Sequence, residues 1–508
     1  MRKFLANGLL LGLSLLLCLV VAEGATRWAD DLPLTALTLP ASNGGIGLDT
    51  TAQRLDEVPR AASVPREWFF NDPPPLPNRH AVPQEWIELD RLLQEKGPSY
   101  RFDFKPWDIF KAWNAAFVGD PCANDFFADV PGWLFVYDPP GGEKRPIYRY
   151  LPNATTPMGL VTNQFGWRGP PVRFARSEKT IRIVFVGAST TAGAHSTAYS
   201  YPEFVGHWLN MWAAARRPDI RFEVINAGRE AVSSWDIEAI VRQEVAPVHP
   251  DLVLYYEGVN QFEPGKIVKN MPAAAPPHPG LAPDGVLARS LQAGSRHLAL
   301  VRRIQSLIGM FELPEGGREW PKPDYEVAWP HGLDEFDPDL GRSDLPVNLS
   351  TIMQDLDRIR ADLAKVDSEL ALSSVMWLVK DGMALDPIRG RIIWEYLNIY
   401  RFPFRYRDIE RLAAFQNRVF AKYAATRGLP FIDVAGRMPF DANLFADAVH
   451  TTYPGGRLKA WVVLQQLVPI IEKRLASGAW PKPVPVMGDT HPAFTTKPRQ
   501  IPVDCKPR

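Results

Sequence analysis

The stretch Ile181-Arg-Ile-Val-Phe-Val-Gly-Ala-Ser-Thr-Thr-Ala-Gly193 decides the fold of this chain. Its first six residues, rich in isoleucine and valine, predict a strand buried on both faces. The glycine-flanked turn after them predicts a tight exit into a helix, with Ser189 at the carboxyl end of the strand. Ligands of open α/β sheets bind at that end, where a helix N-terminus favours negative charge. The position suits a nucleophile, although plain turns and phosphate cradles share the pattern; a Walker lysine and a full dinucleotide fingerprint are absent.

Two later apolar segments end on residues suited to bind an oxyanion. Segment 221–228 closes on Gly228, whose backbone N–H can approach a substrate closely because glycine has no Cβ. Segment 251–260 closes on Asn260, whose side-chain amide offers a second donor. Both segments predict strands, so the two donors are expected at the sheet edge that carries Ser189.

A fourth segment, 445–456, contains Asp447 and His450, three positions apart. On a tight loop or a helical turn, that spacing lets the carboxylate reach Nδ1 of the imidazole. The carboxylate would then fix the imidazole tautomer, which leaves Nε2 free to accept the serine proton.

These four segments, in this order, resemble the SGNH (GDSL-like) hydrolase family, named for its Ser, Gly, Asn and His residues. The resemblance spans about residues 160–475 and implies a three-layer α/β/α fold with a flavodoxin-like parallel sheet. It also implies a carboxylic ester hydrolase whose roles fall on five residues: the triad Ser189, Asp447 and His450, and an oxyanion hole made by the N–H of Ser189 with Gly228 and Asn260.

One position departs from the family pattern, and each site residue also has an ordinary structural interpretation. The family motif has aspartate before the serine, where this chain has Ala188, but that aspartate is not part of the triad. Ser189 alone could be a helix N-cap and Gly228 a plain turn glycine. His195 competes for the role of base because it follows Ser189 in the same loop, yet it has no carboxylate nearby in sequence. The joint occurrence of four motifs at predicted strand ends favours catalysis.

Composition and periodicity support a globular enzyme. Lys+Arg and Asp+Glu number 57 each, so no net charge argues for nucleic acid, and none is expected as a partner. The 49 prolines predict long irregular segments. Predicted helices alternate with strands, which indicates a parallel sheet wrapped on both faces. The helices are expected at about 201–215, 234–246, 350–369, 405–427 and 454–476, and the strands include 371–379 and 429–435.

The N-terminal residues predict export from the cytoplasm. Arg2 and Lys3 precede an apolar stretch, Phe4–Ala22, that is about long enough to cross a thin membrane. The positive charges place the N-terminus inside, so an uncleaved anchor would present the enzyme to the periplasm or extracytoplasmic space. Val20-Val-Ala22 also offers a signal-peptide cleavage site, which would give a secreted protein instead. Lipidation of Cys18 is not expected, because Leu17 stands where a lipobox has a small residue.

The expected organisation has five parts. They are a signal anchor or signal peptide (1–24), a Pro-rich linker (25–79), an N-terminal accessory region (80–170), the hydrolase domain (171–478) with a long insertion (262–345), and a Pro-rich tail (479–508). Within the accessory region, segments 133–138 and 144–150 predict a β-hairpin across a Pro-Pro-Gly-Gly turn. Aromatics from Trp86 to Phe117 predict a small core rather than a sugar-stacking surface. The segment Thr162-Asn-Gln-Phe-Gly-Trp-Arg-Gly169 resembles the lead-in of many bacterial envelope members of the family.

Neither a cofactor nor a metal is expected. The acidic residues of the insertion, Asp334, Asp337, Asp339 and Asp344, fail the calcium-loop pattern, because Arg342 and Asn348 occupy its glycine and glutamate positions. Cys122 and Cys505 could pair in an oxidising compartment or remain unrelated thiols.

The sequence therefore predicts an exported serine esterase that hydrolyses O-acyl esters, such as acetyl groups on an envelope glycan. A lipid ester fits the same triad. The alternatives are an O-acyltransferase acting on a polysaccharide and a non-catalytic glycan-binding or scaffolding protein. The oligomeric state is left open.

Overall fold

The centre of the molecule is a five-stranded sheet in which every pairing is parallel. The computed structural model describes residues 2–39, 51–76, 115–118, 133–276, 290–307 and 317–502, apart from short gaps inside these ranges. The strand order is β10-β9-β6-β4-β5. The strands are β4 (Thr180–Gly187), β5 (Arg221–Asn226), β6 (Leu252–Tyr256), β9 (Glu369–Ser373) and β10 (Phe431–Ile432).

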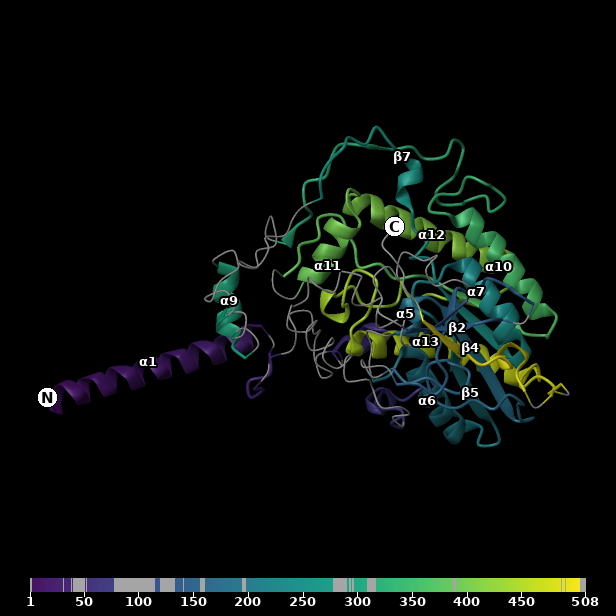
Figure 1. Ribbon diagram of the computed structural model, residues 1–508, viewed down its shortest axis with the longest axis horizontal. Helices are drawn as coiled ribbons and strands as arrows, with labels where there is room; N and C mark the ends of the chain where they lie inside the picture. Colours follow the sequence, from purple (N-terminus) through teal and green to yellow (C-terminus); the bar gives the residue numbers. More distant parts are fainter. Residues whose placement is uncertain are drawn as a thin grey trace.

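Helices cover both faces of this sheet, which confirms the predicted three-layer α/β/α fold (Figure 1). Helices α6 (Tyr201–Arg216) and α13 (Tyr453–Ala476) pack together on one side. On the other side, α10 (Leu349–Ala364) packs between α7 (Ser234–Ile240) and α12 (Tyr406–Thr426). All residues of the central strands β4 and β6 are buried, as their apolar sequences require.

The chain leaves β4 towards β5 and then returns to β6 on the other side of β4. This reversal makes the carboxyl ends of β4 and β6 a topological switch point, the place where doubly wound sheets bind ligands. Ser189 directly follows β4 at this point, and Asn260 follows β6.

Two element boundaries differ from the predictions around β9. The helix expected over 350–369 ends at Ala364, because Asp367 adopts a left-handed conformation (φ 52°) and the Ser368 N–H returns to the Leu363 carbonyl at 2.9 Å. The strand expected over 371–379 leaves the sheet after Ser373. The chain then crosses towards the site, where the Leu378 N–H donates to Ala448 O at 2.7 Å.

The predicted hairpin in the accessory region is wrong. Strands β2 (Trp133–Tyr137) and β3 (Tyr148–Tyr150) form, but β1 (Ala115–Val118) lies between them, parallel to β2 and antiparallel to β3. The apolar β1 fills the centre of this small sheet, and β11 (Arg499–Pro502), from the tail, pairs with the other edge of β2. Phe117 is buried on β1; the aromatics Trp86, Tyr100, Phe102, Phe104, Trp107, Phe110 and Trp113 lie outside the described residues, as do Cys122 and Cys505.

Part of the expected linker over 25–79 belongs to the folded domain instead. Two 3₁₀ helices, Arg54–Glu57 and Arg66–Phe70, bring apolar residues into the core. Phe69 is fully buried, with its ring centroid 6.0 Å from that of Trp208 on α6 and 5.6 Å from that of Trp461 on α13. Burial of such apolar side chains outweighs the extended preference of the neighbouring prolines.

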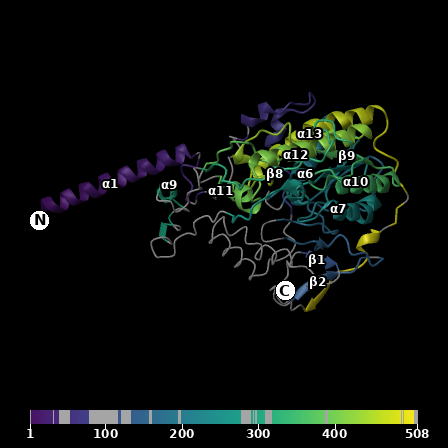
Figure 2. The same cartoon turned by 90° about the horizontal axis from the view of Figure 1, so that it is seen from above.

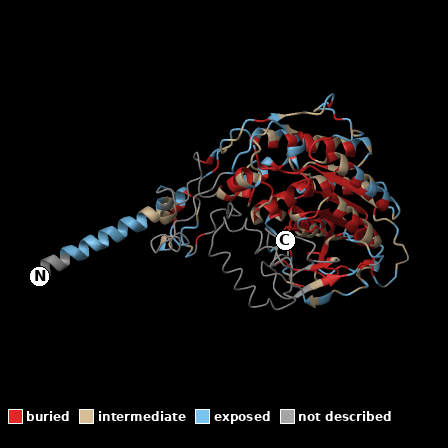
Figure 3. Cartoon of the chain, turned by 45° about the horizontal axis from the view of Figure 1, so that its top comes forward, coloured by how far each residue is buried: buried red, intermediate tan, exposed pale blue. Residues whose placement is uncertain are grey.

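Helix α1 (Arg2–Ala29) projects away from the rest of the molecule and exposes its apolar residues (Figures 2 and 3). Among the described residues, its part Asn7–Ala29 is the only segment long and apolar enough to cross a membrane. A signal anchor and a signal peptide both have these features.

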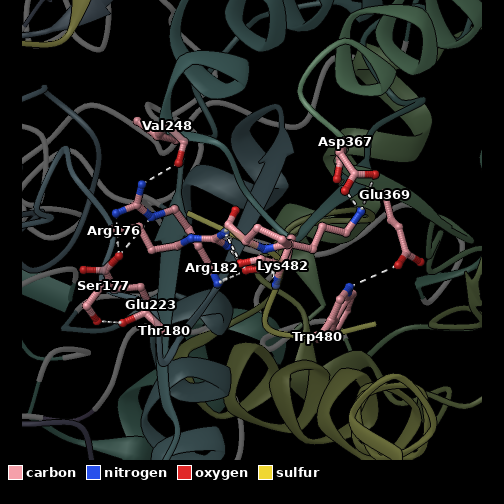
Figure 4. A network of polar contacts seen from close by, with 12 residues as sticks. Arg176, Ser177, Thr180, Arg182, Glu223, Val248, Asp367, Glu369, Trp480 and Lys482 are labelled. Atoms are coloured by element: carbon pink, nitrogen blue, oxygen red, sulfur yellow. Dashed lines mark hydrogen bonds and ion pairs between the residues drawn. The ribbon is translucent and has the colours of Figure 1, made fainter. Parts of the chain in front are cut away.

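At the amino ends of the strands, a polar network fastens the C-terminal tail to the sheet (Figure 4). Asp251, just before β6, is fully buried and accepts hydrogen bonds from the Arg176 side chain and from the backbone N–H groups of Arg182 and Lys482. The Arg182 guanidinium in turn binds Glu223 at 2.7 Å. The tail is therefore fastened to the sheet at Lys482, buries Trp480 and His491, and reaches the small sheet through β11.

Candidate active site

Ser189 is the first residue of a single helical turn, α5 (Ser189–Ala192), that begins directly after β4. The last residue of β4, Gly187, has no room for a side chain. A Cβ at this position would lie 2.2 Å from Tyr256 O and 2.3 Å from Thr191 Oγ1. The glycine thus allows the serine turn to pack against the end of β6.

Ser189, His450 and Asp447 are joined by consecutive hydrogen bonds. His450 Nε2 lies 2.7 Å from Ser189 Oγ, and His450 Nδ1 lies 2.7 Å from Asp447 Oδ2. The other carboxylate oxygen, Oδ1, accepts the backbone N–H groups of Val449 and His450, both at 2.8 Å. The Asp447 carboxylate thus binds the backbone of the residues that follow it and holds their loop closed. This closed loop brings the Asp447 and His450 side chains together.

The surroundings of the imidazole favour proton transfer from the serine. Burial lowers the pKa of His450, but the charge and hydrogen bond of Asp447, aided by the charge of Glu230, outweigh burial, so the pKa is raised overall. With its proton on Nδ1, towards Asp447, the neutral ring presents Nε2 as an acceptor to the serine hydroxyl. The same carboxylate would stabilise an imidazolium formed by such a transfer.

Gly228, which the sequence predicts as an oxyanion donor, lies against the serine turn. A Cβ on Gly228 would lie 2.7 Å from the backbone nitrogen of Ala192 and 2.9 Å from Thr191 Cγ2, so a larger residue would push α5 away. The Gly228 N–H donates to Asn226 Oδ1 at 3.0 Å. Binding of an oxyanion at this N–H would therefore require the Asn226 bond to be shared or exchanged.

Asn260 follows β6 and is exposed at the same sheet edge. Its side-chain amide donates to Val232 O at 2.7 Å, which uses one of its two N–H bonds and fixes the orientation of the amide. The structure thus places both predicted donors at the edge that carries the hydrogen-bonded Ser189, His450 and Asp447.

Glu257 shapes the Asn260 turn, and the sequence analysis did not single it out. Its side chain is fully buried, and Oε1 accepts the Asn260 N–H at 2.8 Å. Burial raises the pKa of Glu257 to about 7, against the opposing effect of backbone N–H groups from Asn260, Gly258 and Val259. The signal available in sequence was an acidic residue directly after a wholly apolar strand.

Lys459, on α13, is a second buried charged residue beneath the site that sequence reasoning missed. Its Nζ donates to Thr190 O at 3.1 Å and lies 3.5 Å and 4.0 Å from the ring centroids of Tyr256 and Tyr201. Burial lowers the pKa of Lys459 well below its ordinary value. A lysine inside the apolar run of the last helix was the available signal.

The segment Thr162–Gly169 supports the end of α5. Asn163 Oδ1 accepts the N–H groups of Phe165 and Trp167, at 2.9 and 3.2 Å, which holds the turn that presents Arg168. The Arg168 guanidinium donates to Ala192 O at 2.9 Å and pairs with Glu203 at 3.0 Å. This buried arginine therefore links the serine turn to the first turn of α6.

The remaining candidates do not add to the site. His195 lies outside the described residues. Of the acidic residues in the insertion, Asp337 binds Lys422 and Asp344 binds Arg342 at 2.7 Å. Within the described part of the chain, no group of three or more His, Cys, Asp or Glu residues could hold a metal ion.

Comparison with known proteins finds similarity among solved structures alone. No protein-family model and no curated protein sequence matches the chain. A GDSL-like lipase from Bacteroides thetaiotaomicron is 13% identical (TM-score 0.27), with 58% of this chain and 89% of that chain covered. The acetylxylan esterase Axe2 from Geobacillus stearothermophilus is 14% identical (TM-score 0.30), with 57% and 96% covered. The acetyl xylan esterase AlAXEase is 13% identical (TM-score 0.30), with 56% and 97% covered. These values mark a distant similarity, and no residue role is transferred from them.

Proposed function

We propose that this chain is a serine esterase of the SGNH type that hydrolyses O-acyl esters. The observation that carries the proposal is the hydrogen-bonded series Asp447–His450–Ser189 at the carboxyl edge of a parallel sheet. A carboxylate, an imidazole and a hydroxyl in that order activate a serine for acyl transfer. A serine that merely caps a helix does not require an imidazole at 2.7 Å whose other nitrogen is held by a buried carboxylate.

In the first half of the reaction, the Ser189 hydroxyl proton moves to His450 Nε2 while Oγ attacks the ester carbonyl carbon. The negative charge that develops on the carbonyl oxygen is stabilised by the N–H of Ser189, the N–H of Gly228 and the amide of Asn260. His450 then gives the proton to the departing alcohol oxygen, and the acyl group remains on Oγ.

In the second half, a water molecule gives its proton to His450 and attacks the acyl carbon. Collapse of the second tetrahedral intermediate returns the proton to Ser189 and releases the carboxylic acid. A sugar hydroxyl in place of water would make the same site an acyltransferase.

We place the enzyme on the extracytoplasmic side of a membrane, with α1 as its anchor and the N-terminus inside. Arg2 and Lys3 before the apolar stretch support this orientation. In addition, α1 continues without a break through the small-residue site at Ala22 to Ala29. The substrate that fits this location is an acyl ester, such as an acetyl group, on an envelope glycan.

The test is acid release from p-nitrophenyl acetate and from acetylated glycan by the purified full-length protein, beside Ser189→Ala and His450→Ala. Ser177→Ala is a matched control, because Ser177 lies before the opposite end of β4 and its hydroxyl bonds to the nearby Thr180. Loss of activity in the two site variants, with the control unchanged, supports the proposal. A folded wild-type protein that releases no acid, with or without sugar acceptors, contradicts it and favours a binding protein.

A further inference from the structure

Helix α9 (Ala299–Leu307), in the long insertion, is attached to the end of α1. The Glu23 carboxylate accepts the backbone N–H groups of Ala299 and Leu300, both at 2.9 Å. These are the first two N–H groups of α9, which have no partner inside their own helix. Figures 1 and 2 both show α9 beside the end of α1 that is nearest the rest of the molecule.

Two further links strengthen this attachment. Arg303 of α9 pairs with Asp30, which directly follows α1. The Arg27 side chain is buried and donates to His297 O at 2.7 Å and to the carbonyls of Pro33 and Ala36 at 2.9 Å. Polar groups just beyond the apolar stretch of α1 are therefore used to hold a helix that is about 270 residues away in sequence.

These contacts set the height of α9 relative to a bilayer that contains α1. The apolar stretch ends at Ala22, and Glu23 is the first charged residue after it. Because a charged carboxylate avoids the hydrocarbon core, Glu23 would lie at the boundary with the headgroups. The first turn of α9, bonded directly to Glu23, would then lie at that boundary too.

At this height, α9 exposes apolar side chains on one face. Leu300, Ile304 and Leu307 follow the i, i+4, i+7 spacing that places residues on one side of a helix. Ile304 is 40% exposed and Leu307 81% exposed, whereas Arg303 is held by Asp30. At about 100° per residue, Arg303 lies beside Leu307, so the apolar face borders the contact with Asp30 and extends away from it towards Ile304.

The residues after the apolar stretch expose further apolar side chains. Trp28 is 78% exposed, and Leu34 and Leu37 are 63% and 88% exposed. Tryptophan is enriched where membranes meet water, and exposed leucines in this number are unfavourable in water.

We propose that α9 and residues 28–37 form a membrane-bound collar, whose exposed apolar side chains enter the boundary between headgroups and acyl chains of the bilayer that α1 crosses. This inference depends on the proposed anchor role of α1. The partner of the collar is the lipid bilayer. By joining α9 to the end of α1, the collar would keep this part of the insertion at the membrane surface.

The test measures the depth of nitroxide labels on the full-length protein in nanodiscs of phosphatidylcholine and phosphatidylglycerol. Cys18, Cys122 and Cys505 are first replaced by serine, and single labels are then placed by Ile304→Cys and Leu307→Cys. Phe336→Cys is the control matched to Leu307, because Phe336 is an apolar residue of the same insertion with nearly the same exposure (80%), and its neighbour Glu335 binds α12 through Arg411 and Arg418. The readout is the accessibility of each label to oxygen, which concentrates in lipid, relative to a water-soluble nickel complex.

We expect a ratio of oxygen to nickel accessibility several-fold higher at 304 and 307 than at 336. Equal, aqueous values at all three positions would overturn the collar. The intact mass of the same sample reports on the anchor: a chain that starts after Ala22 overturns the anchor and the collar together. Turnover of p-nitrophenyl acetate by the labelled protein reports separately on the esterase proposal.

Discussion

The two ends of the central sheet both bury charged side chains, but they treat them differently. At the amino end, Arg176 and Asp251 are buried as an ion pair, and Arg182 binds Glu223. At the carboxyl end, the hydrogen-bond partners of buried Lys459 and Glu257 are backbone groups, and aromatic rings also surround the lysine. The carboxyl end also holds the buried Arg168–Glu203 pair, so the difference between the two ends lies in Glu257 and Lys459, whose hydrogen bonds are to backbone groups.

The difference in pairing has a consequence for ionisation. A buried ion pair keeps both partners charged, and its removal from one side leaves an isolated charge in the protein interior. A buried group without a close opposite charge shifts its pKa towards the neutral form, as burial does for Glu257 and Lys459. We infer that the amino end secures the structure and that the carboxyl end is adapted to the reaction. Four substitutions test this division between the two ends.

The largest expected effect is that of Ser189→Ala on turnover. Loss of the nucleophile in a hydrogen-bonded triad lowers kcat by about 10⁴–10⁶. The measurement is steady-state hydrolysis of p-nitrophenyl acetate, with the denaturation midpoint determined on the same samples. A variant with near wild-type turnover would show that the carboxyl end is not the reactive end.

Asp251→Ala should act on stability alone, because it leaves the Arg176 guanidinium buried without its carboxylate. We expect the free energy of unfolding to fall by about 3–5 kcal/mol, with kcat per folded molecule unchanged. Urea unfolding checks the first value and active-site titration the second. Asp219→Ala, which removes the carboxylate of an exposed pair with Arg217, is the control and should leave stability unchanged. A large loss of kcat in folded Asp251→Ala would contradict the division between the two ends.

Asn260→Ala should lower kcat by about 10²–10³ with little change in KM, because an oxyanion donor acts mainly in the transition state. Steady-state kinetics on a soluble ester is the measurement. If kcat is unchanged, Asn260 supports the loop through Val232 and does not bind the oxyanion.

Glu257→Gln should have the smallest effect, on the pH dependence of stability. The pKa of Glu257 is raised to about 7 in the folded protein from its ordinary 4.5. Between these two values the folded state binds more protons than the unfolded state, so the contribution of this residue to stability falls as pH rises from about 4.5 to about 7. The variant should therefore gain stability relative to the wild type at pH 8 compared with pH 4. Parallel pH profiles of the denaturation midpoint would contradict this.

Local patterns in the sequence were enough for much of this fold. The six residues before Gly187, rich in isoleucine and valine, predict the central strand, and the periodicity of the major helices places most of their boundaries within a few residues of those in the structure. The spacing of Asp447 and His450 also lets one loop carry both side chains. Whether these residues catalyse a reaction stays a prediction until the variants are measured.

Features that depend on distant segments could not be read from the sequence. Strand β1 separates β2 from β3 because its apolar residues fill the centre of the small sheet, and no local signal orders those strands. Phe69 looks like part of a linker until Trp208 and Trp461 enclose it. Burial likewise determines the roles of Glu257 and Lys459, and it comes from helices far away in the chain.

The pairing of β11 with β2 has a consequence for synthesis. Arg499, on β11, binds Asp138 after β2, and these residues are 361 positions apart. A nascent chain therefore presents the aromatic β2 long before its partner strand has been made, and this open edge invites pairing with other chains. That edge stays without its partner strand until the tail has been made.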